Sequence, residues 1–383
     1  MKTSTERILV THVGSLPRSQ AVTDVLFARD RGDAMDETAA DATIRDAVAQ
    51  VVQKQADSGV DIVSDGEMSK ISYATYIEDR LTGFAGDSPR EPGQDLVDFP
   101  RILKRLADTG ATAKYTRPRC VGEIQTRSTH GADVDVENMR AAISATRPTE
   151  AFLNAASPGV IALFQPNDYY KTQDDYLEAV AEAMRTEYEL IVSCGLLLQI
   201  DAPDLAMGRH TMYRDRSVQE FLSRAARHIE VLNHALRNVP ADRVRMHVCW
   251  GNYEGPHHHD VPLEQLLPVI VKAKVQGLLF EGANPRHAHE WAVFRDHKVP
   301  EDWVLIPGVI GSTTNYVEHP LLVAERICRY ADLVGRERVI AGSDCGFGTF
   351  AGFGPVDPDV AYLKLRSLAE GAGIASRRLW GKP

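Results

Sequence analysis

A chain of 383 residues is long enough to form one large α/β barrel with insertions or two ordinary domains. Hydrophobic residues make up 44% and charged residues 25% of it, which are the proportions of a water-soluble globular protein. The net charge of −10 argues against nucleic acid or an anionic membrane as the main partner, and no apolar run approaches the roughly 18 residues of a membrane span.

The N-terminal segment, residues 1–7, lacks the apolar core of a signal peptide and leads directly into a first predicted strand at residues 8–13. That strand runs into a Gly-Ser pair and a proline, which favours a tight loop with exposed backbone groups. Residues 38–57 follow with apolar side chains at helical spacing, and Gly59 is a usual residue just past a helix end. An alternation of strand and helix therefore begins here.

Residues 60–67 predict a second strand and loop that contain two acidic residues, Asp65 and Glu67. Acidic side chains beside a glycine at a strand end are typical of a functional site, although a solvated turn explains them equally well. Residues 71 to about 145 fit the alternation least well, because they contain a Pro- and Gly-rich loop and a short strand at residues 119–124. We predict an insertion here, a β-hairpin with a nearby helix that projects from the main body.

The rest of the chain returns to the alternation, and the predicted strands start near residues 8, 60, 152, 196, 244, 278, 304 and 339. Residues 160–164 have a strand-like composition as well, so the boundary of the third strand stays open. Residues 176–194 and 217–236 predict amphipathic helices. Eight strands alternating with helices predict a single (β/α)8 barrel over residues 1–383, whose strands all point their C-terminal ends at one mouth.

Ten polar residues fall at these predicted strand ends: His12, Ser15, Asp65, Glu67, Asp201, His247, Cys249, Glu281, Asp344 and Cys345. In a barrel of this kind the active site lies at the C-terminal face. Ten polar residues sharing one mouth are hard to explain as core packing, so we expect a functional site there.

Four of these residues form a candidate zinc site. His247 and Cys249 are two positions apart on one strand, so their side chains leave the backbone on the same face. Later strands end in Glu281 and Cys345, and thiolate, imidazole and carboxylate are all zinc ligands. Five cysteines in so long a chain form no disulfide framework, so we expect a cytoplasmic protein with reduced thiols. The alternative is that the buried cysteines serve only as small apolar residues.

Taken together, these motifs resemble the catalytic barrel of the cobalamin-independent methionine synthase family. The matching segments lie in order along nearly the whole chain, at residues 11–18, 64–67, 199–203, 247–249, 281 and 344–346. The resemblance implies that one Zn²⁺ is bound by His247, Cys249, Glu281 and Cys345. It also implies that the amino and carboxyl groups of a thiol acceptor are bound by Ser15, Glu67 and Asp201.

The chain departs from the family pattern in three ways. The full-length family enzyme has a second, N-terminal barrel that helps to hold folate, and 383 residues leave no room for it. The family's seventh strand is followed by a histidine proposed as a general acid, and residues 308–316 contain none at the matching place. The family's Asp-Glu-Pro reads Asp201-Ala202-Pro203 here. A related branch of short single-barrel enzymes includes epoxyalkane:coenzyme M transferases, which the chain resembles in length and in a histidine-rich loop at residues 255–260.

The resemblance implies a zinc-dependent transfer of an alkyl group, methyl in the first instance, to a small thiol such as homocysteine, because binding to zinc deprotonates a thiol. The donor is left open between a folate, a corrinoid and an epoxide. The proton for the leaving group has three candidate sources in His12, Asp344 and the histidines at residues 257–259. Two carboxylates, Glu67 and Asp201, favour an acceptor with an ammonium group, whereas the sulfonate of coenzyme M would need a cation such as Arg18.

Two other functions stay open at this stage. A metal-free decarboxylase of the uroporphyrinogen type has a related fold, and the cysteines would then be incidental. A zinc hydrolase would use His257, His258 and His259, although a solvated loop is the simpler explanation of these three residues. The sequence carries no signal for the oligomeric state.

Overall fold

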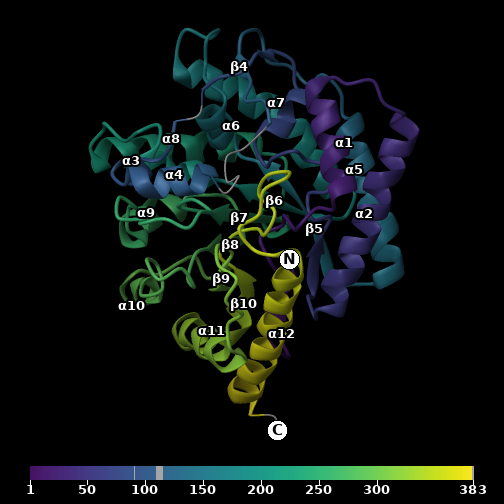
Figure 1. Cartoon of the computed structure of the whole chain (residues 1–383). Coiled ribbons are helices and arrows are strands. Elements are labelled where there is room, and N and C mark those ends of the chain that lie inside the picture. Colours follow the sequence, from purple (N-terminus) through teal and green to yellow (C-terminus); the bar gives the residue numbers. More distant parts are fainter. Residues whose placement is uncertain (90, 109–114, 382–383) are drawn as a thin grey trace.

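The computed structural model describes residues 1–89, 91–108 and 115–381. One eight-stranded parallel sheet curves into a nearly closed barrel, with helices on its outside (Figure 1). Its strands are β1 (Leu9–Val10), β2 (Ile62–Ser64), β5 (Glu150–Ala156), β6 (Leu197–Asp201), β7 (Val244–Val248), β8 (Gly277–Phe280), β9 (Val304–Ile310) and β10 (Ile340–Ser343). The order around the barrel follows the chain, and β10 pairs with β1. All eight predicted strands and the predicted (β/α)8 fold are confirmed.

The barrel closes between β1 and β2 through a few hydrogen bonds rather than a ladder. The Asp61 N–H donates to the Val10 carbonyl at 2.9 Å, and the Asp61 carboxylate accepts the Val10 N–H at 2.9 Å. The Thr11 hydroxyl donates to the Ile62 carbonyl at 2.9 Å. These contacts hold the first two strands edge to edge where regular pairing is absent.

The helices form an outer ring: α1 (Gln20–Arg31), α2 (Glu37–Asp57), α5 (His130–Thr146), α6 (Pro158–Phe164), α7 (Gln173–Ser193), α8 (Val218–Ala235), α9 (Leu263–Ile270), α10 (Val293–Asp296), α11 (Pro320–Val334) and α12 (Pro358–Trp380). The last helix, α12, packs along α11 and reaches α2 and β1, which joins the two ends of the ring (Figure 1). In the part of the chain that the structure describes, no helix has the length and apolar character of a membrane span.

Side chains of the barrel strands alternate between two apolar layers, because successive residues of a strand point to opposite faces. The layer inside the barrel consists of Leu9, Val13, Ile62, Phe152, Leu197, Leu279, Val304, Ile306 and Ile340. The larger layer lies between the strands and the outer helices. Each fully buried Leu, Ile or Phe contributes about 1.5–3 kcal/mol, so the two layers supply most of the stability of the fold.

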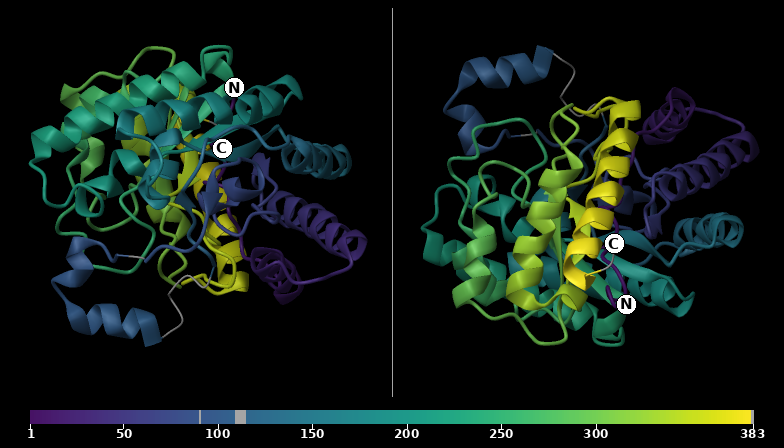
Figure 2. Two further views of the ribbon diagram at one scale, coloured as in Figure 1. Left: turned by 90° about the horizontal axis from the view of Figure 1, so that it is seen from above. Right: turned by 90° about the horizontal axis from the view of Figure 1, so that it is seen from below.

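The predicted insertion is a small two-stranded sheet with two short helices. Strand β3 (Phe84–Ala85) pairs antiparallel with β4 (Arg119–Cys120), and α3 (Gln94–Val97) and α4 (Pro100–Asp108) lie between them in sequence. The two helices project beyond the outer ring (Figure 2). Helix α5 packs between α2 and α7 in the ring, so the part that leaves the barrel alternation ends near residue 129 rather than 145.

Residues 160–164 are helical, which resolves the open boundary of the third strand. The Ser157 hydroxyl accepts the Val160 N–H at 2.9 Å and caps helix α6, and Pro158 occupies its first turn. A serine cap followed by proline starts a helix even before an apolar run that would otherwise suit a strand.

The start of the insertion is tied to the ring by a buried ion network. Arg80 lies 2.7 Å from Asp135 on α5 and 3.2 Å from Glu187 on α7, and all three side chains are at most 9% exposed. The hydroxyl of Tyr76 donates to Glu187 at 2.7 Å. Removing one member of a buried ion network leaves its partners charged and unpaired, which is costly.

We therefore expect Arg80→Met to lower the free energy of unfolding by about 3–5 kcal/mol, because Asp135 and Glu187 lose their cation. Urea unfolding measures the change. The control Arg185→Met removes an arginine of α7 that is 27% exposed and pairs with Glu182 and Glu189, which are 50% and 33% exposed, and it should leave the midpoint nearly unchanged. Equal small effects of both substitutions would contradict an anchoring role for Arg80.

Candidate metal centre and acceptor cavity

The C-terminal ends of the barrel strands open into a cavity of about 1220 Å³. Its outer wall includes residues of α3 and α4 from the insertion and the loop at residues 313–316. Its floor carries six of the predicted strand-end residues: Ser15, Glu67, Asp201, His247, Cys249 and Cys345. The structure thus gathers six residues that are up to 330 positions apart in the chain.

Two thiols and an imidazole converge at this floor. The sulfur atoms of Cys249 and Cys345 are 3.0 Å apart without a disulfide, and the Cys345 sulfur is 3.8 Å from His247 Nε2. The ligand atoms of the three residues all lie within 4.8 Å of one another, and each residue is at most 5% exposed. His247 lies on β7, which Cys249 follows, whereas Cys345 follows β10. Because β8 and β9 lie between these two strands in the sheet, it is the curvature of the barrel that brings the three residues together at its mouth.

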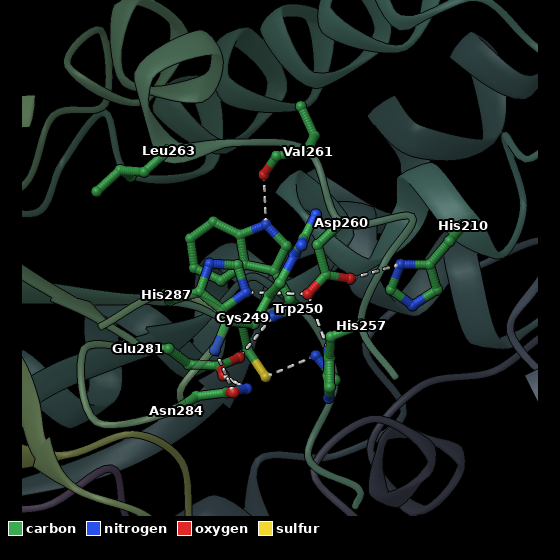
Figure 3. A network of polar contacts seen from close by, with 12 residues as sticks. His210, Cys249, Trp250, His257, Asp260, Val261, Leu263, Glu281, Asn284 and His287 are labelled. Carbon is green, nitrogen blue, oxygen red and sulfur yellow. Dashed lines mark hydrogen bonds and ion pairs between the residues drawn. The ribbon is translucent and has the colours of Figure 1, made fainter. Parts of the chain in front are cut away.

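The fourth predicted ligand, Glu281, lies beside Cys249 (Figure 3). It does not belong to the convergent set of His247, Cys249 and Cys345. One carboxylate oxygen accepts the Trp250 N–H at 2.9 Å, and the other accepts the Asn284 side-chain amide at 2.8 Å. The hydrogen bond with Cys345 lowers the pKa of the Cys249 thiol, but burial and the nearby Glu281 carboxylate raise this pKa overall.

The donor set fits zinc. Two cysteines and one histidine are usual zinc ligands, and three protein ligands leave a position for a substrate. Burial raises the pKa of Cys345 well above its ordinary value, so only a bound cation would keep both thiols deprotonated at neutral pH. His247 Nδ1 lies 3.5 Å from the Asp201 carboxylate, an orientation that outer carboxylates commonly impose on metal-binding histidines.

The Asp201 carboxylate is held in place by two side-chain amides. Asn154 Nδ2 donates to one oxygen and Gln199 Nε2 to the other, both at 2.9 Å. Two neutral donors orient the carboxylate without placing a positive charge beside it. Asn154 was not predicted as a site residue, although a polar residue at an inward-facing position of an apolar strand is a usable signal.

Glu67 is the second carboxylate of the floor. Its Oε2 is buried without a hydrogen-bond partner, and the residue holds a left-handed backbone conformation with φ of 57°. Burial first, and then the charge of Asp201, raise the pKa of Glu67 to about 8. A buried oxygen without a hydrogen-bond partner is unusual, and Glu67 lines the cavity, where the N–H of a ligand would satisfy it.

Ser15 reaches the same floor from the loop after β1. A side chain at Gly346 would put its Cβ 2.0 Å from the Ser15 oxygen, so only glycine lets the two loops approach. The Phe347 N–H donates to the Ser15 carbonyl at 2.8 Å and fixes this approach.

His12 and Arg18 do not reach the cavity. His12 Nε2 contacts the Gln55 side-chain oxygen at 2.7 Å, Nδ1 accepts the Gly14 N–H at 3.1 Å, and burial lowers the pKa of His12 to about 4. Arg18 donates to the Glu67 carbonyl at 2.8 Å and to the Gly348 carbonyl. Both ring nitrogens of His12 are therefore already engaged by the protein, and neither is available to a substrate. Arg18 connects two loops through their carbonyl oxygens and does not face the cavity, where it could bind an anion.

Asp344 is likewise engaged by the protein itself. Its carboxylate accepts the backbone N–H groups of Gly282 and Ala283 at 2.8 Å and of Asn284 at 2.6 Å. Burial and the charge of Glu281 raise the pKa of Asp344 to about 7. We therefore assign Asp344 to the support of the loop after β8 rather than to proton transfer.

The three adjacent histidines do not act as one cluster. His257 is buried and its Nδ1 lies 2.8 Å from Asp260, whereas His258 and His259 are exposed and both contact Asp98, at 3.0 and 2.6 Å. The three histidines therefore do not form the shared zinc-ligand set that the hydrolase hypothesis requires. The interpretation as a solvated loop holds for His258 and His259, but not for the buried His257.

Comparisons with known proteins agree with these motifs. The family described as "Cobalamin-independent synthase, Catalytic domain" matches residues 8–90. A methionine synthase of Saccharolobus solfataricus is 25% identical over 374 residues, covering 96% of this chain and 95% of that protein. One of Sulfurisphaera tokodaii is 24% identical, covering 97% and 94%. The chain is related to the cobalamin-independent methionine synthases. The resemblance expected from the sequence motifs is thereby confirmed.

Solved structures share the barrel fold. A B12-independent methionine synthase from Shewanella sp. W3-18-1, in complex with selenomethionine, superposes with a TM-score of 0.73 at 17% identity, covering 98% of this chain and 99% of that one. A putative vitamin-B12-independent methionine synthase from Listeria monocytogenes has a TM-score of 0.64 at 16% identity, covering 96% and 98%.

The raised pKa of Glu67 predicts a pH dependence of stability. An ordinary glutamate titrates near about 4.3, so between roughly pH 4.3 and 8 the folded chain holds a proton that the unfolded chain releases. The contribution of Glu67 is therefore fully present at low pH and is lost as the pH rises through about 8.

We expect the unfolding free energy of the metal-free chain to fall relative to that of Glu67→Gln over this window, measured by urea unfolding with chelator at a series of pH values. Glu254→Gln, which alters an exposed carboxyl at the cavity rim, is the matched control. A pH-independent difference between the unaltered chain and Glu67→Gln would contradict the assignment.

Proposed function

We propose that the chain transfers a methyl group to the sulfur of a small amino-thiol of the homocysteine type, with a zinc ion held by His247, Cys249 and Cys345. The observation that carries this proposal is the pair of thiols 3.0 Å apart beside an imidazole, at the floor of a cavity that also presents two carboxylates. When bound there, zinc would supply a deprotonated, nucleophilic acceptor sulfur. The relatives named methionine synthase support the same reaction class.

Among the side chains of the protein, Glu281 is the candidate fourth ligand for the zinc ion when no substrate is bound. Its carboxylate stands next to Cys249, while Trp250 and Asn284 offer it hydrogen bonds whenever it is not a ligand. The convergence of the thiols favours this function over a metal-free decarboxylase, in which the cysteines would have no reason to meet.

The floor of the cavity suits the ammonium group of the acceptor. The unpartnered Glu67 oxygen would gain a donor, which favours its ionised form, and Asp201 is already oriented by its two amide donors. Ser15 adds a hydroxyl for the acceptor's polar tail. A sulfonate acceptor such as coenzyme M would meet two carboxylates, and the nearby Arg18 is bound to backbone carbonyls.

The alkyl donor belongs in the outer part of the cavity. An aromatic wall lies between the floor and the insertion, and it consists of Tyr73, Tyr115, Phe164, Phe350 and Phe353. Ring centroids along it are 5.4 to 6.2 Å apart, which gives a continuous apolar surface. Burial, followed by the charges of Tyr115 and Cys249, raises the pKa of Tyr73 well above its ordinary value, so its hydroxyl keeps its proton beside the reacting sulfur.

Zinc X-ray absorption tests the metal site. The zinc-loaded chain should show two zinc–sulfur contacts at about 2.3 Å. Cys249→Ser or Cys345→Ser should each remove one of these contacts and weaken zinc binding. Serine substitutions at Cys120, Cys194 and Cys328 are the controls and should keep both contacts, because these thiols lie elsewhere. Zinc bound without any sulfur neighbour in the unaltered chain would refute the site.

Calorimetry on the zinc-loaded chain tests the acceptor. Homocysteine should bind, and Glu67→Gln and Asp201→Asn should each weaken it roughly ten-fold or more, since a hydrogen bond to a charged group contributes about 1.5–3 kcal/mol. Glu254→Gln at the rim should bind it normally. Tight binding of coenzyme M without binding of homocysteine would instead favour an epoxide-opening transferase.

A further inference from the structure

A second group of metal-ligating side chains lies behind the cavity floor, with Asp260 at its centre (Figure 3). Three imidazoles reach it from the loops after three successive strands: His210 after β6, His257 after β7 and His287 after β8. Each of the four residues is at most 7% exposed. His257 Nδ1 and His287 Nε2 lie 2.8 and 2.9 Å from the same oxygen of Asp260.

If His257 and His287 are neutral, they carry too few N–H groups for the acceptor oxygens that surround their rings. His287 meets Asp260 through Nε2 and Glu290 through Nδ1, at 2.9 and 2.8 Å. His257 meets Asp260 through Nδ1 and the Tyr253 carbonyl through Nε2, at 2.8 and 3.2 Å. Both nitrogens of each ring therefore face acceptors, whereas a neutral imidazole carries one N–H. Either each ring is an imidazolium or a cation lies between the rings and Asp260.

His210 distinguishes these two possibilities. Its Nδ1 lies 3.2 Å from the other oxygen of Asp260, the contact drawn in Figure 3, but without hydrogen-bond alignment, and neither of its ring nitrogens has a hydrogen-bond partner. That oxygen of Asp260 is also without a hydrogen bond. Buried polar atoms are rarely left unpaired, and two imidazolium ions at His257 and His287 would do nothing for either of these groups. A metal ion among the four residues would engage them together.

We propose that His257, Asp260 and His287 bind a divalent first-row transition metal ion, zinc among them, with His210 as the fourth ligand. The ligand atoms of the first three residues already lie within 4.8 Å of one another. Three imidazoles and a carboxylate are a usual set for such ions. Binding would release one proton from each of the His257 and His287 imidazolium rings, so the two positive charges lost from the rings equal the charge of the ion gained.

The groups around this set complete the arrangement. With the metal on one nitrogen, each of the two rings donates its remaining N–H outward, His287 to the Glu290 carboxylate and His257 to the Tyr253 carbonyl. Metal-binding histidines are commonly oriented by such outer acceptors. Of the four residues only His210 lines the acceptor cavity, and four protein ligands leave no position for a substrate, so the site is structural.

The structural role follows from what the four ligands are attached to. The His287 ring stacks on the Trp250 ring with centroids 4.2 Å apart. The backbone N–H of Trp250 donates a hydrogen bond to the Glu281 carboxylate. The Tyr253 hydroxyl donates to Asp95 at the start of the insertion's α3, and the His257 N–H contacts the same carboxylate at 3.3 Å. The second ion would therefore fix both the loop that carries Cys249 and the outer wall of the cavity.

The test uses the full chain with Cys249→Ser and Cys345→Ser, which removes the sulfur ligands of the other site. This variant should bind one equivalent of zinc with only nitrogen and oxygen neighbours by X-ray absorption. With cobalt it should give visible d–d bands without thiolate charge-transfer bands. Adding His287→Gln or His257→Gln should abolish that binding, whereas the matched control His258→Gln, one position along the same loop, should leave it unchanged.

A measurement on the unaltered chain decides the matter if these variants fail to fold by circular dichroism. Nitrogen NMR of the ring atoms should show that zinc removes one proton from His257 and one from His287. If the cysteine variant binds no zinc, or if both rings in the unaltered chain keep two protons with zinc present in excess, the cluster is an imidazolium pair and the proposal is overturned. Neither outcome depends on the thiol acceptor or on methyl transfer.

Discussion

The candidate active site depends on the carboxylate of Asp344. It accepts three consecutive backbone N–H groups from the loop after β8. Glu281 directly precedes the first of these donors in the chain, and Cys345 directly follows Asp344. The Asp344 carbonyl oxygen also lies 3.2 Å from His247 Nε2. One residue thus sets the relative position of groups from β7, β8 and β10. It has room only because β9 has Gly308 there, where a Cβ would lie 2.1 Å from the carboxylate.

The acidic floor of the cavity is offset by two cations buried behind it. Arg245 lies inside the barrel with its guanidinium 4.0 Å from the Phe152 ring centre, and burial lowers its pKa to about 9. Lys70 donates to the Asn154 carbonyl, and its ammonium lies 4.4 Å from the Tyr76 ring centre. Neither cation lines the cavity, so neither one occupies the side of Glu67 and Asp201 that is open to a ligand.

The sequence was sufficient for features that depend on local periodicity. Eight strands and the common mouth follow from alternating apolar runs and helices, and the His247–Cys249 pair follows from the two-residue repeat of a strand. Strand ends also predicted that Ser15, Glu67, Asp201 and Cys345 lie at one cavity. Helix α6 was ambiguous because its composition suits a strand and only its serine cap and proline decide the outcome.

Features that depend on distant partners were out of reach. His12 looked available for proton transfer, but Gln55 and the Gly14 N–H occupy both nitrogens. Arg18 looked like an anion-binding residue, but two loop carbonyls take its guanidinium. His287 lies in no recognisable sequence motif, and its contacts with Asp260 and Trp250 come from the loop after a different strand, β7. A one-dimensional pattern locates a polar residue at a strand end without giving the groups that already satisfy it.

The pairing of β1 with β10 has a consequence for how the protein is made. Leu9 lies opposite Ile340, so the barrel closes only when a strand near the end of the chain reaches the first one. Contacts of such separation form late, and on the ribosome they wait for most of the polypeptide to emerge. Cys345 follows directly on that strand, whereas His247 and Cys249 emerge about a hundred residues earlier. A nascent chain therefore exposes only part of the proposed ligand set, and tight metal uptake at the proposed site would report that the barrel has closed.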